Sequence, residues 1–167
     1  MQALQAQDYG YLAELANSYR DASLAALKKE AHYNPRLSVD ALCFQYGEVR
    51  INGASTLVGA LITPCALWML VVPEQATLSA PLEESLVVSL PSGRYRMTLE
   101  RLPNGIEFYQ RCILNDLSEL ESLQEASRLA QRMMEQNLVG EWMQEIRRGK
   151  ALADMVAKAT VKDSDGT

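Results

Sequence analysis

The stretch from residue 58 to residue 73 constrains the fold more than any other part of the chain. Pro64 divides it into two apolar runs, and the thiol of Cys65 is its one ionisable group. Because proline cannot donate to a strand ladder, Pro64 ends the first run, which we expect to be a strand. Together with Pro73 it keeps the stretch below the roughly 18 uninterrupted apolar residues that a membrane-spanning helix needs. A segment with so little polarity must lie in the core or form a binding surface.

Size and composition predict one globular domain. The chain has 167 residues, of which 48% are hydrophobic and 22% charged. This is enough for a hydrophobic core that needs no disulfide or metal to stabilise it. We expect this domain to cover residues 1–160 and a flexible polar tail to cover residues 161–167. Sixteen basic and 21 acidic residues leave a net charge of −5. This charge disfavours nucleic acid and anionic membranes and favours a basic partner.

Cysteine usage and the N-terminal residues indicate a cytoplasmic protein. Cys43, Cys65 and Cys112 are odd in number and widely spaced, so the sequence contains neither a disulfide framework nor a Cys-x-x-Cys motif. Free thiols of this kind suit a reducing compartment. The first residues are polar, and no basic segment leads into an apolar one, so no secretory signal is visible.

Helical periodicity occurs near both ends of the chain. Apolar and small residues recur every three or four positions over residues 8–30, which predicts an amphipathic helix ended by Asn34-Pro35. A second helix is expected to begin at Ser118, because Ser118 and Glu121 have the order of a capping box. Its apolar face consists of Leu120, Leu123, Ala130, Met133 and Met134. Gly140 then interrupts the pattern before a final helix that carries Trp142, Met143, Ile146, Leu152 and Met155.

Alternation and turn chemistry predict strands in the middle of the chain. Residues 42–46 alternate, and residues 49–51 continue with the opposite parity, which indicates a bulge. Asn52-Gly53 tolerates the positive φ angles of a type I′ turn, so residues 49–51 and 55–62 are expected to form a hairpin. A second hairpin is expected around the turn at residues 103–105.

The fold class follows from the order of these elements. Residues 85–90 carry few polar side chains and are expected to form a buried strand. An N-terminal helix followed by hairpins and then by C-terminal helices predicts an α+β fold. We expect an antiparallel sheet of two hairpins plus the buried strand, covered by N-terminal and C-terminal helices.

The sequence gives little support to catalysis or to a metal site. His32 is the single histidine and precedes the expected helix end, which excludes a site built from several histidines and favours a structural role. The cysteines lie in apolar contexts, where a thiol is usually an inert hydrophobe, although Cys65 follows the break at Pro64 and exposure there is left open. No Gly-x-Gly-x-x-Gly phosphate loop occurs. We therefore expect no cofactor, no metal and no enzymatic activity.

Two features favour a binding protein over an enzyme. The first is a set of acids without neighbouring bases, namely Glu74, Glu83, Glu84, Asp116, Glu119, Glu121 and Glu125. The second is an excess of adaptable apolar side chains, with seven methionines beside Trp68, Trp142 and Tyr95. Adaptable apolar side chains of this kind are typical of grooves that bind peptides. Each feature has a plainer explanation, since acids favour helix N-termini and methionines pack cores.

Several short motifs resemble those of one family. They are Leu61-Ile62-Thr63-Pro64, Leu70-Val71-Val72-Pro73, Val88-Ser89-Leu90-Pro91-Ser92-Gly93 and Tyr109-x-x-Cys112. Their order and spacing resemble the HybE type of [NiFe]-hydrogenase assembly chaperone over residues 37–130. The family usually has tryptophan directly after Thr-Pro, where this chain has Cys65 and places Trp68 three residues on, so a divergent member is indicated. Some relatives carry a fused rubredoxin domain with paired cysteines, which this sequence lacks, so no iron cofactor is implied.

The resemblance implies a cytoplasmic chaperone. Its partner would be the precursor small subunit of a [NiFe] hydrogenase, bound near the twin-arginine signal peptide, and export would wait until the large subunit is assembled. Other maturation proteins are further expected partners. Such a signal is a cationic segment followed by an apolar one, so its receptor needs acids beside an apolar groove.

The residues expected to contact that partner fall into two groups. The acids that would meet its arginines are Glu83, Glu84, Asp116 and Glu119. The side chains that would contact its apolar part are Trp68, Met69 and Tyr95. Two alternatives stay open at this point: a small ligand-binding or enzymatic domain that uses Cys65 or His32, and a homodimeric scaffold whose apolar patch is the dimer interface.

Overall fold

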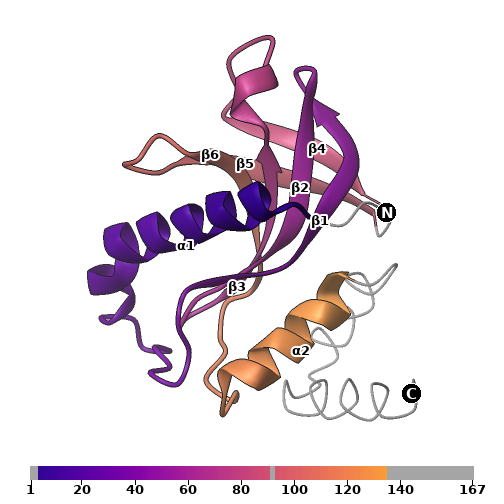
Figure 1. Ribbon diagram of the computed structural model, residues 1–167. Helices are drawn as coiled ribbons and strands as arrows, with labels where there is room; N and C mark the ends of the chain where they lie inside the picture. Colours follow the sequence, from indigo (N-terminus) through magenta and orange to yellow (C-terminus); the bar gives the residue numbers. More distant parts are fainter. Residues whose placement is uncertain (1–3, 91–92, 135–167) are drawn as a thin grey trace.

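The computed structural model describes residues 4–90 and 93–134, which form two helices and six strands (Figure 1). The elements are α1 (Ala6–Leu27), β1 (Asp40–Ile51), β2 (Ala54–Ile62), β3 (Leu67–Pro73), the short 3₁₀ helix η1 (Gln75–Thr77), β4 (Ser85–Leu90), β5 (Gly93–Arg101), β6 (Glu107–Leu114) and α2 (Leu123–Met134). The final helix expected after Gly140 and the tail at residues 161–167 lie outside the described residues. Neither described helix is long and apolar enough to cross a membrane.

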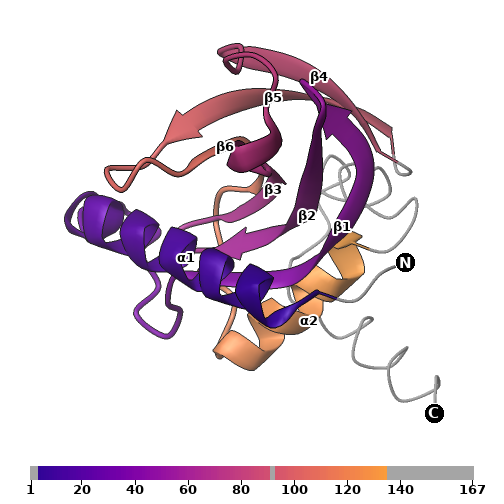
Figure 2. The same cartoon turned by 45° about the horizontal axis from the view of Figure 1, so that its top comes forward.

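The strands form one antiparallel sheet in the order β1-β2-β3-β6-β5-β4. Two three-stranded meanders are joined where β3 pairs with β6. The sheet curls strongly, so that its edge strands β1 and β4 approach one another, although no described pairing joins them (Figure 2). With α1 and α2 packed against this sheet, the predicted α+β class is confirmed.

The sheet differs from the expectation at β3 and β4. Residues 67–73, which the sequence showed only as a second apolar run, form the central strand β3, paired with β2 and β6. The run lacks alternation because both of its faces are buried. Residues 85–90 form an edge strand rather than a buried one, and Val87 is 40% exposed. Leu86 and Val88 point inward, whereas Ser85 and Ser89 are exposed, so only one face is buried.

Local turn chemistry is as expected at the first hairpin. Asn52 has φ 47° and Gly53 has φ 81°, as a type I′ turn requires. The predicted bulge in β1 is confirmed by register shifts between Leu42 and Gln45 and between Tyr46 and Arg50. At the second predicted hairpin, Gly105 has φ 91° between β5 and β6.

Helix α1 covers one face of the sheet, here called the α1 face. Its buried residues Leu12, Leu15 and Ala16 pack on side chains from β2, β3 and β6, namely Leu57, Leu61, Leu70, Val72 and Phe108. The hydroxyl of Tyr46 on β1 donates to Asp8 in the first turn of α1. The helix expected over residues 8–30 is therefore observed, and its apolar periodicity is the reason that it docks.

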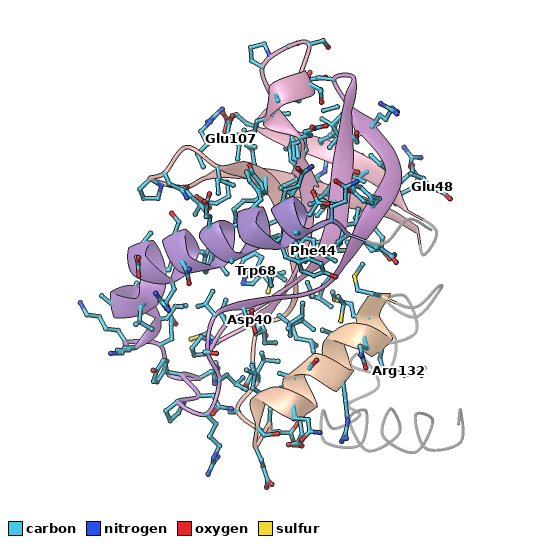
Figure 3. The ribbon with its side chains drawn as sticks, viewed as in Figure 1. Asp40, Phe44, Glu48, Trp68, Glu107 and Arg132 are labelled. Carbon is cyan, nitrogen blue, oxygen red and sulfur yellow. The ribbon has the colours of Figure 1, made fainter. Side chains whose placement is uncertain are left out.

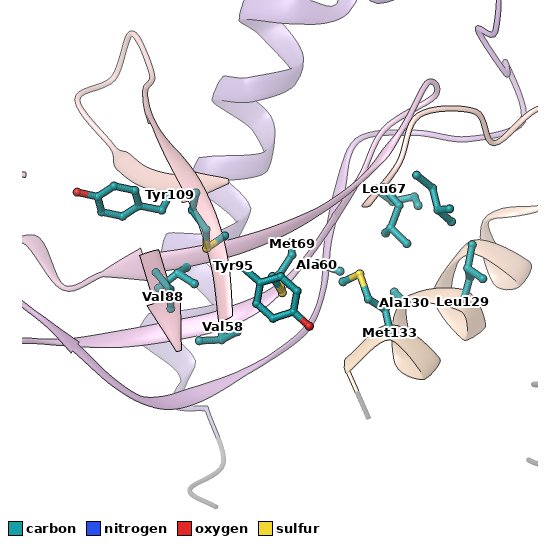
Figure 4. Close-up of a cluster of buried hydrophobic side chains, with 14 of the residues drawn as sticks. Val58, Ala60, Leu67, Met69, Val88, Tyr95, Tyr109, Leu129, Ala130 and Met133 are labelled. Atoms are coloured by element: carbon teal, nitrogen blue, oxygen red, sulfur yellow. The ribbon is translucent and has the colours of Figure 1, made fainter. Parts of the chain in front are cut away.

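Helix α2 covers part of the opposite face, here called the α2 face (Figure 4). Its buried residues are Ala126, Leu129, Ala130, Arg132 and Met133. It begins four to five residues later than expected, because Ser122, not Ser118, is its capping residue. The hydroxyl of Ser122 accepts from the Glu125 amide at 3.2 Å, and the Glu125 carboxylate accepts from the Glu121 amide at 2.8 Å. Both serines fit the capping pattern, but the Ser118 hydroxyl donates to Asp116 instead.

A buried asparagine fixes the position of the segment that leads into α2. Asn34, only 3% exposed, donates through Nδ2 to the carbonyl oxygens of Leu117 at 3.0 Å and Leu120 at 2.9 Å. Its backbone amide donates to the carbonyl of Pro64 at 2.9 Å. One residue thus joins the α1–β1 connection, the β2–β3 turn and the β6–α2 segment.

Candidate functional site

The two neighbouring residues Trp68 and Met69 point to opposite faces of the sheet, as successive strand residues must. Trp68 lies on the α1 face, partly exposed beside α1 (Figure 3). Met69 lies on the α2 face and is 1% exposed, packed within the core (Figure 4). Of these two predicted contact residues, only Trp68 therefore reaches solvent.

Tyr95 is also enclosed by the protein. It lies on β5 in the same core cluster as Met69 and is 6% exposed. The Arg111 guanidinium lies over its ring at 5.8 Å from the centroid, a cation–π distance. A partner could reach Met69 or Tyr95 only if the core opened, so the structure brings these two together but away from Trp68.

Glu83 and Glu84 lie in the loop before β4 and are exposed. The Glu84 carboxylate accepts from Arg101 Nη1 at 3.0 Å, and Arg101 Nε donates to Glu107 at 2.7 Å. The Glu83 carbonyl accepts from the hydroxyl of Tyr109 at 2.7 Å, which leaves the Glu83 carboxylate facing solvent. Glu84 is thus partly neutralised by Arg101.

Asp116 and Glu119 lie beyond the opposite end of β6 and are exposed. Hydrogen bonds from the hydroxyl of Ser118 at 2.6 Å and its amide at 3.0 Å hold the pKa of Asp116 below its usual range. His32 Nδ1 lies 3.4 Å from the other Asp116 oxygen. The eight residues of β6 separate the two acid pairs by about 25 Å. A single peptide would have to be extended to touch both pairs.

A second group of polar and aromatic residues, missed by the sequence analysis, lies on the same face of the sheet as Trp68. It consists of Tyr19 from α1, Glu100 from β5 and Gln110 and Cys112 from β6, and we call it with Trp68 the Glu100 niche. Trp68 is opposite Cys112 in the strand register, and Gln110 Nε2 donates to the Glu100 carboxylate at 3.2 Å.

The niche combines acid and aromatic groups on the α1 face. Burial, and then the nearby negative charge of Glu100, raise the pKa of Tyr19. Alternation along β5 and β6 shows which of these residues share a face, but only the pairing register brings them together.

The cysteines and His32 do not form a catalytic group. Cys65 is 8% exposed, so the exposure left open by the sequence does not occur, and its Sγ lies 3.4 Å from the carbonyl of Leu27. Burial raises the pKa of Cys43, Cys65 and Cys112, which keeps all three as thiols at neutral pH. Among the described residues, no three His, Cys, Asp or Glu side chains lie together as a metal site would require.

The motifs that carry the family resemblance are structural where they are described. Thr63 is fully buried, and its hydroxyl oxygen accepts from the amides of Cys65 at 3.1 Å and Ala66 at 2.9 Å, closing the β2–β3 turn. Leu61 and Ile62 are in the core, and Pro73 ends β3. These residues therefore define the fold and do not locate the binding surface.

Comparison with known proteins places the chain among assembly chaperones. It belongs to the family described as [NiFe]-hydrogenase assembly, chaperone, HybE, whose model matches residues 11–157. The solution structure of HybE from Escherichia coli has a similar fold, with a TM-score of 0.53 and 18% sequence identity over 77% of this chain and 76% of that one. At this identity the likeness shows the fold alone. The family predicted from the sequence is confirmed.

A short stretch of the chain is similar to part of a second known protein. Over 37 residues it is 68% identical to trigger factor of Cutibacterium acnes (strain DSM 16379 / KPA171202). That stretch covers 22% of this chain and 7% of trigger factor. A match to so small a part of trigger factor assigns none of that protein's activity to this chain.

Proposed function

We propose that the chain binds the precursor small subunit of a [NiFe] hydrogenase at its twin-arginine signal peptide and holds back export until the large subunit is assembled. The observation that carries the proposal is the family match over residues 11–157, since the family consists of assembly chaperones for these hydrogenases. The protein would act in the cytoplasm, where the precursor still carries its signal and other maturation proteins are present.

The charge of the chain supports a cationic partner. A twin-arginine signal presents basic residues followed by an apolar segment. The exposed carboxylates of Glu83, Glu84, Asp116 and Glu119 would attract the basic residues, and complementary charge raises the association rate. The net charge of −5 acts in the same direction.

The apolar part of the signal requires an accessible apolar side chain. Trp68 is partly exposed and would serve as the aromatic anchor. Met69 and Tyr95 would contribute indirectly, because their buried side chains hold β3 and β5 in the positions that present Trp68 and the acids.

The test is the affinity for a precursor small subunit at low and high salt. The double variant Glu83→Lys/Glu84→Lys should bind more weakly mainly at low salt, because exposed charges are screened over a Debye length of about 10 Å at 0.1 M. The variant Trp68→Ala should bind more weakly at every salt concentration.

A matched control separates local charge from net charge. Asp21 and Glu30 are exposed at the far end of α1 and in the turn after it. Each exchange of an acid for lysine adds two charges, so Asp21→Lys/Glu30→Lys also changes the net charge from −5 to −1. This control should bind as the unmutated protein does. If the Glu83/Glu84 and Trp68 variants also bind unchanged, the site is wrong, and if the unmutated protein binds no precursor, the function is wrong.

A further inference from the structure

The Glu100 niche contains hydrogen-bond acceptors without a matching cation. Each ion pair among the described residues involves other acids, namely Asp21, Glu84, Glu107 and Asp116. Glu100 is partly buried and, within residues 4–90 and 93–134, accepts only from the side-chain amide of Gln110, at 3.2 Å. The other polar atom of this amide, Gln110 Oε1, is buried and has no hydrogen-bond partner in the part of the chain that the structure describes. A buried acceptor without a donor is costly, and such atoms call for an explanation.

Aromatic side chains and an opening to solvent complete the niche. Tyr19 and Trp68 both pack on the α1 face, and Tyr19 lies near enough to Glu100 for the charge of that acid to raise its pKa. Cys112, opposite Trp68 in the register, is exposed, so solvent reaches this side of the niche. The niche therefore places an acid near two partly buried aromatic side chains on a face that is open to solvent at Cys112.

We propose that the Glu100 niche is the subsite for one arginine side chain of the partner peptide, with Glu100 and Gln110 accepting from the guanidinium and Trp68 and Tyr19 against its plane. A guanidinium has five donors in a fixed plane, which suits a carboxylate and an amide oxygen side by side. Its flat face stacks on aromatic rings, whereas a lysine ammonium makes neither the forked contact nor the stack.

The guanidinium takes the place of Gln110 Nε2 as the donor to Glu100, and rotation of the freed Gln110 amide turns Oε1 toward the incoming donors. This subsite rests on the proposed function only in that the arginine is assigned to the signal peptide. Its chemistry is independent of which protein supplies the arginine.

The experiment uses the full chain with Trp142→Phe, so that Trp68 is the one tryptophan and its fluorescence and indole NMR signal report on the niche. The probes are N-acetyl-arginine amide and N-acetyl-lysine amide, followed by a peptide with two adjacent arginines and its lysine counterpart. The arginine compounds should perturb the Trp68 signal at about tenfold lower concentration than the lysine compounds. Glu100→Gln should weaken arginine binding about tenfold and remove the preference for arginine over lysine.

The matched control is Glu107→Gln on the same β5–β6 hairpin. The Glu107 carboxylate accepts a hydrogen bond from Arg101, and Glu107 lies away from Trp68 (Figure 3). The Glu107→Gln variant should therefore keep the full preference for arginine over lysine. Melting curves of both variants exclude a loss of folding as the cause. Equal binding of arginine and lysine, or a Glu100→Gln variant that binds as the unmutated protein does, overturns the subsite. Arginine preference at the niche without any binding of a precursor small subunit would instead support the subsite and refute the proposed function.

Discussion

The side chain of Asn34 should be among the most sensitive positions for stability. Asn34→Ala removes the donor shared by the Leu117 and Leu120 carbonyls, while its backbone bond to Pro64 remains. Both leucines are almost fully buried, so the Leu120 carbonyl would lose its Asn34 donor with little access to water, whereas the Leu117 carbonyl would keep its bond from the Leu120 amide at 3.0 Å. A buried acceptor left unsatisfied costs about 1–3 kcal/mol and the second lost hydrogen bond about 1 kcal/mol, so we expect about 2–4 kcal/mol in total. In the third hydrogen bond of this side chain, Asn34 Oδ1 accepts from the amide of the exposed Arg36. Water can replace that bond in the variant, so its loss adds little to the destabilisation.

Urea unfolding followed by circular dichroism measures this loss as a shift of the midpoint at unchanged slope. Asn34→Asp keeps the shape but puts carboxylate oxygen against the two carbonyls, so it should be at least as destabilising at neutral pH. It should recover as the pH falls and the carboxyl gains a proton to donate. The control Asn17→Ala, at an exposed position of α1, should stay within about 0.5 kcal/mol of the unmutated protein. If Asn34→Ala also stays within that range, Asn34 does not hold the segment in place.

Four further predictions concern backbone, charge and composition. A Cβ at Gly59 would clash with the ring of Phe44, so Gly59→Ala should lower the free energy of unfolding by about 1–3 kcal/mol, and adding Phe44→Ala should remove most of the clash. Gly53→Val should cost about 1 kcal/mol or more, because valine is strained at φ 81°; an unchanged melting temperature would contradict it. The pKa of Asp116 is lower in the folded than in the unfolded protein, so its carboxylate stabilises the fold above the unfolded-state pKa, and this stability is lost as the pH falls through the folded-state pKa. Ser118→Ala should therefore lower the free energy of unfolding at neutral pH and have little effect in strong acid. Unfolding measured at several pH values tests this. Elemental analysis of purified protein should find no stoichiometric iron, nickel or zinc, and about one metal per chain after chelator treatment would refute this.

Local chemistry made parts of the fold predictable from the sequence. The positive φ angles at Asn52 and Gly53 follow from residue type, and the parity switch in β1 follows from alternation. By contrast, β3 is buried on both faces, so no alternation distinguished it as a strand. The start of α2 was misplaced because Ser118 and Ser122 offer the same capping pattern, and only the bond from Ser118 to Asp116 separates them.

The candidate site was less predictable because it depends on which strands are neighbours. Trp68 could be singled out by composition, but its separation from Met69 depends on the buried faces of β3. Glu100 and Gln110 are ten residues apart in sequence and meet only through the β5–β6 register. Tyr19 joins them because α1 packs across the sheet, a tertiary contact that no local pattern contains.

The central claim is that this member of the HybE family binds a hydrogenase small subunit at its signal peptide. Titration calorimetry of the unmutated protein with a [NiFe]-hydrogenase precursor small subunit, and with the same subunit lacking the signal peptide, tests it most directly. The claim predicts saturable binding of the precursor and binding at least about tenfold weaker without the signal, a difference of about 1.4 kcal/mol. Equal affinity for the two forms, or no binding of either, would contradict it.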